Sequence, residues 1–265
     1  MSSKIIKKVV ILAGGKGTRL VEETSVKPKP MVEVGGKPIL WHIMKIYSYY
    51  GINEFVICLG YKGYVIKKYF LNYALLNSDI TVHTRSDKYP EFVVHKNISE
   101  DWKVVLVDTG EETMTGGRLK RVRPYLEQDK DFCMTYGDGV SNVNINKLIL
   151  FHQTHSKLAT VTGVRPHARF GALHIENDLV TQFQEKPVDE GGYVNGGFFV
   201  LSSKILDYID NDTTIWEKEP LQNLAKDRQL AVYLHDGFWH PMDALRDSIN
   251  LNALWDSNKA PWKLW

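Results

Sequence analysis

The chain has 265 residues, a length that fits one large domain or two small ones. Its 33 basic and 31 acidic residues leave a net charge of +2, which argues against bulk binding of nucleic acid. Hydrophobic residues make up 43% of the chain and charged residues 24%, as in ordinary soluble globular proteins.

The cysteines and the N-terminus indicate the compartment. Cys58 and Cys133 stand far apart and form no CxxC pair, so we expect buried thiols in a reducing cytosol rather than a zinc or redox site. The basic N-terminal stretch leads into an apolar run that is too short to span a membrane and ends in a glycine loop instead of a cleavage site. We therefore expect a cytoplasmic protein without a signal peptide or membrane segment.

Strand-like runs alternate with helix-like runs through the first half of the chain. Apolar and β-branched runs predict strands at residues 9–12, 54–59, 80–83, 104–107 and 132–136. Helical patterns, the first with proline at its start and glycine just past its end, predict helices at 38–50, 63–73, 117–126 and 144–155. This alternation is typical of right-handed βαβ units and predicts an α/β fold with a mainly parallel sheet.

The second half of the chain is richer in strand signals. Two strand-like runs within residues 170–187 are joined at 176–178 and predict a hairpin. Another strand is expected at 197–201, and helices at 216–226 and 243–257. The segment 86–102 is polar and irregular, and we expect a surface loop or flap there. No repeat or Pro/Ser-rich linker interrupts the chain, so we expect 1–265 to form one domain.

The motif VVILAGGKGTRL, residues 9–20, places a glycine-rich loop directly after the first strand. A P-loop would need serine or threonine where Gly17 stands. A dinucleotide fingerprint would need glycine where Leu20 stands, which also excludes a nicotinamide oxidoreductase. At the carboxyl edge of an open sheet, the loop N–H groups, the Thr18 hydroxyl and the Arg19 guanidinium suit phosphate oxygens. The alternative is a plain strand-to-helix turn.

Two lysines follow in VKPKPM, residues 26–31. The prolines on both sides of Lys29 predict extended backbone, on which Lys27 and Lys29 share one side. The hypothesis is a lysine held against a polyphosphate, and the alternative is a solvated basic turn.

Two acidic residues are candidate metal ligands. Asp138 stands between Gly137 and Gly139 in TYGDGV, after an apolar strand, where a carboxylate suits Mg²⁺ together with phosphates. A type I′ hairpin turn is the alternative there. Asp243 in FWHPMD stands at a predicted helix start, where the alternative role is an N-cap.

Further motifs offer polar contacts. TGGR puts glycine N–H groups and the donor-only Arg118 at a helix start. QEKP offers Lys186 to a phosphate, and Asn195 in VNGGFF suits hydroxyl groups. The triplet Asp-Thr-Gly at 108–110 occurs once and nothing resembles a second lobe, which excludes an aspartic protease.

Taken in order, these motifs resemble those of the nucleotidyltransferases that make nucleotide-sugars. VILAGGKGTRL marks only the broad superfamily. The remaining motifs together resemble its cytidylyl branch: KPKPMVEVGGKPILWHIMKIYS, DTG with MTGGRLKRV, TYGDGV, RFGAL, FQEKP, NGGFFV, TTIWEKEPL and FWHPMDALRD. The resemblance extends from Val9 to the C-terminal tryptophans. It implies a Rossmann-like, mixed but mainly parallel sheet flanked by helices, with a nucleotide-binding core over about 7–140 and a smaller, β-rich, sugar-phosphate-binding half over about 141–265.

The resemblance also implies an activity: formation of CDP-glucose and pyrophosphate from CTP and α-D-glucose 1-phosphate, with Mg²⁺, for dideoxysugars of O-antigen-type polysaccharides, by a homo-oligomer such as a hexamer. It implies catalytic roles for Arg19, Lys29, Asp138 and Lys186, and metal binding by Asp138 and Asp243. It implies sugar-phosphate contacts from Glu185, Lys186, Asn195 and Gly196. It implies nucleotide contacts from Leu12, Ala13, Gly14, Gly15, Lys16, Gly17, Thr18, Arg19, Lys29, Thr113, Arg118, Gly137 and Asp138.

Arg118 gives a physical reason for a preference for cytosine. A donor-only side chain aimed at N3 suits cytosine, where N3 is an acceptor. Uracil carries a hydrogen on N3, which would clash with the N–H donors of Arg118. The alternatives are the same chemistry with UTP, dTTP or another sugar 1-phosphate, and a non-catalytic module that binds a nucleotide-sugar. Intact Lys29, Asp138, Asp243 and Lys186 favour catalysis over such a module.

Overall fold

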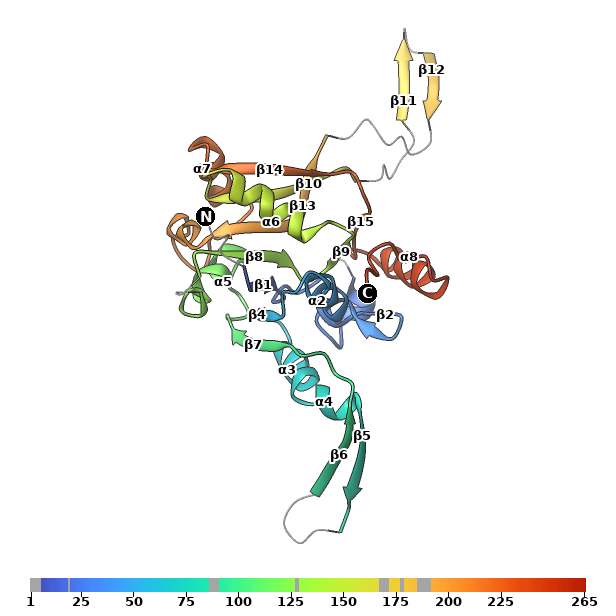
Figure 1. Cartoon of the computed structure of the whole chain (residues 1–265). Coiled ribbons are helices and arrows are strands. Elements are labelled where there is room, and N and C mark those ends of the chain that lie inside the picture. The colour runs from blue at the N-terminus through green and yellow to red at the C-terminus, as the bar shows by residue number, and fades with distance from the viewer. Residues whose placement is uncertain are drawn as a thin grey trace.

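A seven-stranded mixed sheet forms the centre of the molecule, with strand order β14-β10-β13-β8-β1-β4-β7 (Figure 1). The structure is a computed structural model, and it describes residues 6–18, 20–85, 91–126, 129–166, 172–176, 179–184 and 192–265. β1 (Lys8–Leu12) pairs in parallel with β4 (Glu54–Leu59) and with β8 (Asp131–Tyr136). β7 (Lys103–Asp108) extends this parallel half of the sheet beyond β4.

The other half of the sheet contains the antiparallel pairings. β13 (Val194–Ser202) runs antiparallel to β8 on one side and to β10 (Ala159–Val164) on the other. β14 (Leu230–His235) lies parallel to β10 at the edge. The predicted α/β class with a mixed, mainly parallel sheet is therefore confirmed, although β10 and β14 were not among the expected strands.

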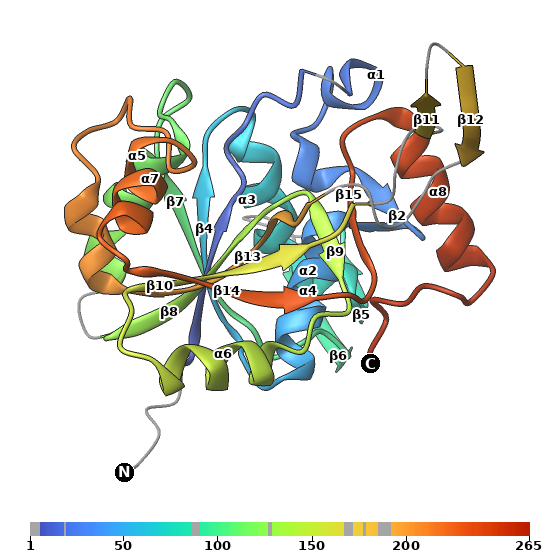
Figure 2. The ribbon, with the colours of Figure 1, turned by 90° about the horizontal axis from the view of Figure 1, so that it is seen from above.

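Helices cover both faces of the sheet, because successive side chains of a strand point to opposite faces. The apolar core on one face contains Val9 and Ile11 of β1 together with residues of α2 (Ile39–Tyr49), α3 (Gly63–Leu71) and α6 (Ile145–Thr154). The core on the other face contains Val10 and Leu12 with residues of α5 (Thr115–Arg121) and α7 (Glu219–Lys226). Figure 2 shows α6 and α7 on opposite sides of the strands.

Two hairpins project from this body (Figure 1). β5 (Ser78–His83) pairs with β6 (Glu91–Asn97), and β11 (Ala172–Glu176) pairs with β12 (Leu179–Gln184). The second hairpin confirms the prediction for 170–187, and its turn residues 177–178 lie outside the described residues. The expectation of a loop over 86–102 is wrong for β6, which is a strand. Residues 92–96 of β6 are all exposed, so the strand has no buried face and lacks the alternation of apolar and polar residues that predicts a strand.

Most helix predictions are confirmed with small changes of bounds. The helix expected at 63–73 divides into α3 and α4 (Tyr73–Leu76). The helix expected at 117–126 is α5 followed by a 3₁₀ turn, Arg123–Tyr125, which contains Pro124. The last helix, α8 (Leu245–Asp256), begins after Ala244. None of the helices in the described part of the chain has the length and apolar character that a membrane crossing requires.

The C-terminal residues close the core over α2. Trp262 is fully buried and donates its indole N–H to Nδ1 of His42, 3.3 Å away, while Nε2 of His42 lies 2.8 Å from the carbonyl oxygen of Val34. Burial lowers the pKa of His42 to about 4. Both cysteines are buried as expected, and burial raises the pKa of Cys58 to about 12.

Candidate active site

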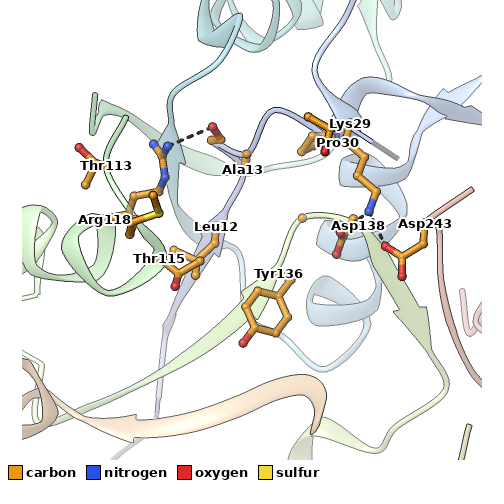
Figure 3. A pocket seen from close by; sticks show the side chains of 16 residues that line it. Leu12, Ala13, Lys29, Pro30, Thr113, Thr115, Arg118, Tyr136, Asp138 and Asp243 are labelled. Atoms are coloured by element: carbon orange, nitrogen blue, oxygen red, sulfur yellow. Dashed lines mark hydrogen bonds and ion pairs between the residues drawn. The ribbon is translucent and has the colours of Figure 1, made fainter. Parts of the chain in front are cut away.

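A pocket of about 350 Å³ opens where β1 and β8 end, at the carboxyl edge of the parallel half of the sheet (Figure 3). Ligands commonly bind at this edge of open α/β sheets. The pocket is lined by Leu12, Ala13, Gly14, Gly15, Gly17, Thr18, Lys29, Pro30, Thr113, Met114, Thr115, Arg118, Tyr136, Gly137, Asp138 and Asp243.

The glycine loop after β1 forms one wall of this pocket. Gly17 has φ 64, a left-handed conformation that favours glycine, and its carbonyl oxygen accepts from the Leu20 N–H at 3.0 Å. Thr18 lines the pocket as expected, whereas Lys16 extends to Glu112, with 2.6 Å between Nζ and Oε1. Arg19 lies outside the described residues. The structure therefore brings most of the predicted loop residues to one cavity.

Lys29 lies between the two predicted metal ligands. Its Nζ is 2.7 Å from Oδ2 of Asp138 and 2.7 Å from Oδ1 of Asp243, as the dashed lines in Figure 3 mark. Lys27, by contrast, pairs with Glu23 at 3.6 Å and Glu33 at 3.8 Å. The two lysines thus have different partners. Of the two, only Lys29 lies at the pocket, so the hypothesis of a lysine held against a polyphosphate applies to Lys29.

The backbone around Lys29 differs from the expected extended segment. Lys29–Met31 forms a 3₁₀ turn that begins after Pro28. The prediction of extended backbone is wrong here because proline at the second position of a helical turn loses no hydrogen bond that the turn needs. Because of this turn, the side chains of Lys27 and Lys29 point in different directions, toward different partners.

A local pairing brings Asp243 beside Asp138, although the two residues are far apart in the sequence. β9 (Gly139–Ser141) pairs antiparallel with β15 (Trp239–Pro241), and the Met242 N–H donates to the Asp138 carbonyl oxygen at 2.8 Å. The hairpin alternative for Gly-Asp-Gly is therefore wrong, since β8 pairs with β1 and β13 while β9 pairs with β15.

The N-cap alternative for Asp243 is also wrong. The N-cap of α8 is Ala244, and the Asp247 carboxylate accepts from the N–H groups of Asp243 at 2.9 Å and Ala244 at 2.8 Å. Asp243 is thus held one residue before the helix, and its own carboxylate contacts Lys29.

The charges at this point suit a bound cation. Burial alone would lower the pKa of Lys29, but Asp138 and Asp243 outweigh it, so the pKa of Lys29 is raised and the ammonium stays charged. Carboxylate oxygens are hard donors, and Mg²⁺ is commonly held by one or two carboxylates plus phosphates and water. Asp138 and Asp243 are partly exposed, which leaves room for such further ligands. Within the described ranges, no group of three or more His, Cys, Asp or Glu is placed to hold a metal.

Arg118 reaches the pocket from α5 with only 4% of its surface exposed. Its two terminal nitrogens donate to acceptors on three neighbouring loops, and burial lowers its pKa. The acceptors are the carbonyl oxygens of Gly14, Leu59, Gly110 and Glu111 and the hydroxyl of Thr109, at 2.8–3.1 Å. The guanidinium therefore ties the glycine loop to the ends of β4 and β7 in this structure.

Tyr136, at the end of β8, is a pocket residue that sequence reasoning missed. Its hydroxyl donates to Oε1 of Glu217 at 2.5 Å and accepts from Nδ2 of Asn195 at 3.2 Å. Its position directly before Gly137 in TYGDGV was the available signal. Asn195 thus lies beside the pocket without being part of its wall, and Gly196 is not among the residues that line the pocket. Glu185 and Lys186 lie outside the described residues.

Comparison with known proteins shows the family to which the chain belongs. Residues 8–258 match the family model described as nucleotidyl transferase, so the chain belongs to this enzyme family. It is 58% identical to glucose-1-phosphate cytidylyltransferase of Salmonella typhi, over 97% of this chain and 99% of that relative. It is 46% identical to the probable glucose-1-phosphate cytidylyltransferase of Bacillus subtilis, over 97% of this chain and 100% of that relative.

Solved structures show the same fold. HddC from Yersinia pseudotuberculosis superposes with a TM-score of 0.67 at 24% identity, covering 94% of this chain and 100% of that one. A UDP-glucose pyrophosphorylase solved with UDP-glucose gives a TM-score of 0.67 at 16% identity, covering 96% of this chain and 100% of that one. The expected nucleotidyltransferase fold is therefore confirmed.

Proposed function

We propose that this enzyme transfers a cytidylyl group from CTP to α-D-glucose 1-phosphate and releases pyrophosphate. The observation that carries the proposal is the convergence of Lys29, Asp138 and Asp243 on one point of a pocket walled by the glycine loop. The 58% identity to the Salmonella enzyme supports the choice of substrates. A phosphate-binding loop beside a site for a divalent cation is what a nucleoside triphosphate requires.

The reaction needs positioning more than proton transfer. A phosphate oxygen of the sugar phosphate attacks the α-phosphorus of CTP in line, and the bond from that phosphorus to the pyrophosphate oxygen breaks. The attacking oxygen is already anionic, so no general base is needed. The enzyme must bring two anions together and stabilise the charge of the transition state, which is the work of fixed donors and cations.

The chain offers residues for each part of this task. N–H groups of Gly14, Gly15 and Gly17, with Thr18 and Arg19, would surround the triphosphate, and Lys29 would donate to its oxygens. Asp138 and Asp243 would hold Mg²⁺, which when bound offsets charge on the phosphates. Since Lys29 holds these carboxylates in the structure, metal binding would free its ammonium for phosphate.

The sugar phosphate would meet residues of the second half. Lys186 would pair with its phosphate, while Glu185, Asn195 and Gly196 would contact its hydroxyl groups. Nδ2 of Asn195 lies 3.2 Å from the hydroxyl oxygen of Tyr136, a residue that lines the pocket. This position supports a contact between Asn195 and the sugar.

Base selection would fall to Thr113 and Arg118, which line the same end of the pocket (Figure 3). Because the terminal nitrogens of Arg118 already donate to protein acceptors, a bond to cytosine N3 requires exchange of one of these contacts. The exchange is favourable only if the base supplies an acceptor, as cytosine does and uracil N3 does not.

We also propose that the enzyme is a homo-oligomer, such as a hexamer, working in the cytoplasm on precursors of dideoxysugar polysaccharides. The β5–β6 hairpin supports the assembly, because it exposes Val82, Phe92 and Val93 at 48%, 53% and 51%. Apolar side chains gathered on a projecting hairpin are typical of a contact surface. Light scattering on the purified protein would test this, and a monomer at micromolar concentration would contradict it.

The substrate assignment is tested with a panel of nucleotides and sugars. Pyrophosphate release is measured with CTP, UTP or dTTP, each combined with several hexose 1-phosphates and Mg²⁺. We expect CTP with glucose 1-phosphate to give the highest kcat/KM. Equal rates with UTP would contradict the role of Arg118, and thermal stabilisation by CTP without turnover would favour a binding module.

A further inference from the structure

Glu217 bridges two pocket residues and has no part in the mechanism above. Its Oε1 accepts from the Tyr136 hydroxyl at 2.5 Å, and its Oε2 accepts from the Thr115 hydroxyl at 2.6 Å. Tyr136 and Thr115 both line the pocket, while Glu217 itself is exposed. The carboxylate therefore lies at the rim of the pocket, between the end of β8 and the start of α5.

The neighbouring donors fix the direction of both hydroxyl protons. The Trp216 N–H donates to Oγ1 of Thr115 at 2.9 Å, so the Thr115 proton is left for Glu217. The Gly197 N–H donates to Oδ1 of Asn195 at 2.8 Å, which turns the amide nitrogen of Asn195 toward the Tyr136 oxygen. The Tyr136 proton must then also point to Glu217. Each of these contacts needs Glu217 to be an acceptor, which a carboxylate supplies on both oxygens.

The backbone holds Glu217 at this place. Trp216 is fully buried, and its ring packs against Phe199 of β13 with 6.0 Å between ring centroids. The residue that follows Trp216 is thereby fixed at the pocket rim, in the turn before α7.

We infer that Glu217, with Tyr136 and Asn195, forms a subsite for two neighbouring hydroxyl groups of a sugar ring. A carboxylate has about four acceptor positions, and the two contacts above use one on each oxygen. Each oxygen keeps an acceptor position, and a vicinal diol can donate to both oxygens of one carboxylate. The Tyr136 hydroxyl donates its proton to Glu217 and accepts from Asn195, and its oxygen can accept one further hydrogen bond, from a hydroxyl of the sugar. This inference rests on the proposed function, in which both the ribose and the hexose carry such a diol.

Calorimetric titration of the full-length protein with CDP-glucose and with CDP separates the two sugars. Glu217→Gln keeps the shape but replaces one acceptor oxygen with a donor. Its expected effect on CDP-glucose is a loss of affinity of about 10- to 100-fold, the range for a hydrogen bond to a charged group. Unchanged CDP affinity would assign the site to the hexose, and an equal loss for CDP would assign it to the ribose.

Two further variants complete the test. Tyr136→Phe keeps the ring but removes the hydroxyl, and a smaller loss in the same direction is expected. Glu219→Gln is the matched control, since Glu219 is an exposed acid in the first turn of α7, and no loss is expected. Unchanged affinity in Glu217→Gln, or an equal loss in Glu219→Gln, would overturn the inference. Failure of the wild type to bind CDP-glucose would contradict the proposed function and, with it, the inference.

Discussion

Gly14 lies directly against the guanidinium of Arg118: a Cβ on Gly14 would come within 2.1 Å of Nη1. Gly60, just past β4, would place a Cβ 2.4 Å from the same nitrogen. Arg118 is held in place by acceptors on three loops, so its guanidinium cannot move aside without losing several hydrogen bonds. These two glycines are therefore required by a packed side chain as well as by any ligand.

The first prediction concerns this contact. Gly14→Ala should destabilise the fold by about 1–3 kcal/mol, because overpacking displaces Arg118 from its carbonyl partners. Gly15→Ala is the matched control, since a Cβ at Gly15 meets no atom within 4 Å, and a change below about 0.5 kcal/mol is expected. Urea unfolding of both variants measures the difference. Equal stability of the two variants would show that the guanidinium is free to move.

The second prediction concerns the competition between Lys29 and a metal ion. In the absence of nucleotide, Lys29→Met should bind Mg²⁺ about tenfold more tightly than the wild type, because the metal no longer displaces two partly exposed ion pairs worth together about 1–2 kcal/mol. The same variant should lose kcat, since its phosphate contact is gone.

Metal affinity is measured by calorimetry near pH 8. The pKa of Lys29 is raised above its ordinary value of 10.5, so the side chain is fully charged at pH 8. The stability that this charge contributes to the folded state is lost only as the pH rises beyond that value. Lys27→Met is the control, since Lys27 pairs with Glu23 and Glu33. A wild-type affinity equal to that of Lys29→Met would argue that the metal binds elsewhere.

The third prediction concerns the carboxylates. Asp138→Asn and Asp243→Asn should each lower kcat by about 10²–10³, the usual cost of losing one charge-stabilising group in a transition state. Both should also raise the Mg²⁺ concentration needed for half-maximal rate, while EDTA abolishes turnover by the wild type. Full activity of Asp243→Asn would show that Asp243 is not needed as a metal ligand.

The fourth prediction is a loss of stability in acid that depends on His42. The Trp262 N–H donates to Nδ1, so a proton on that nitrogen would face another donor in the folded protein. The folded pKa is about 4 against an ordinary value of 6.5, so the unfolded chain gains the proton first as pH falls. Between pH 6.5 and 4 this costs the folded state up to about 3 kcal/mol.

His42→Gln removes this titration and provides the comparison. Urea unfolding at pH 7, 6, 5 and 4 compares the variant with the wild type. Whatever the difference at pH 7, the wild type should lose stability relative to the variant as pH falls. A difference that stays constant with pH would show that His42 accepts a proton in the folded protein.

The position of the site could be predicted from the sequence because it depends on strong local signals. The buried runs of β1 and β8 are largely apolar, and glycine follows each run within two residues, so a binding edge was expected after both. The 3₁₀ turn at Lys29 and the strand β6 were missed because each is short or exposed. Neither carries a clear hydrophobic period.

Contacts between distant segments could not be read from the sequence. The pairing of β9 with β15 brings Asp243 to Asp138, and no local pattern in either segment predicts it. The carbonyl partners of Arg118 likewise come from loops after three different strands. The family resemblance supplied Asp138, Asp243 and Arg118, whereas the structure shows which contacts bring each of them to the pocket.

The central claim is that one pocket joins CTP to a sugar phosphate, and ³¹P NMR of the reaction mixture tests it most directly. With wild-type protein, Mg²⁺, CTP and α-D-glucose 1-phosphate, we predict that the resonances of CDP-glucose and pyrophosphate grow in a one-to-one ratio, and that Asp138→Asn slows both together. Release of inorganic phosphate or CMP without CDP-glucose, or no change in any resonance, would contradict the account.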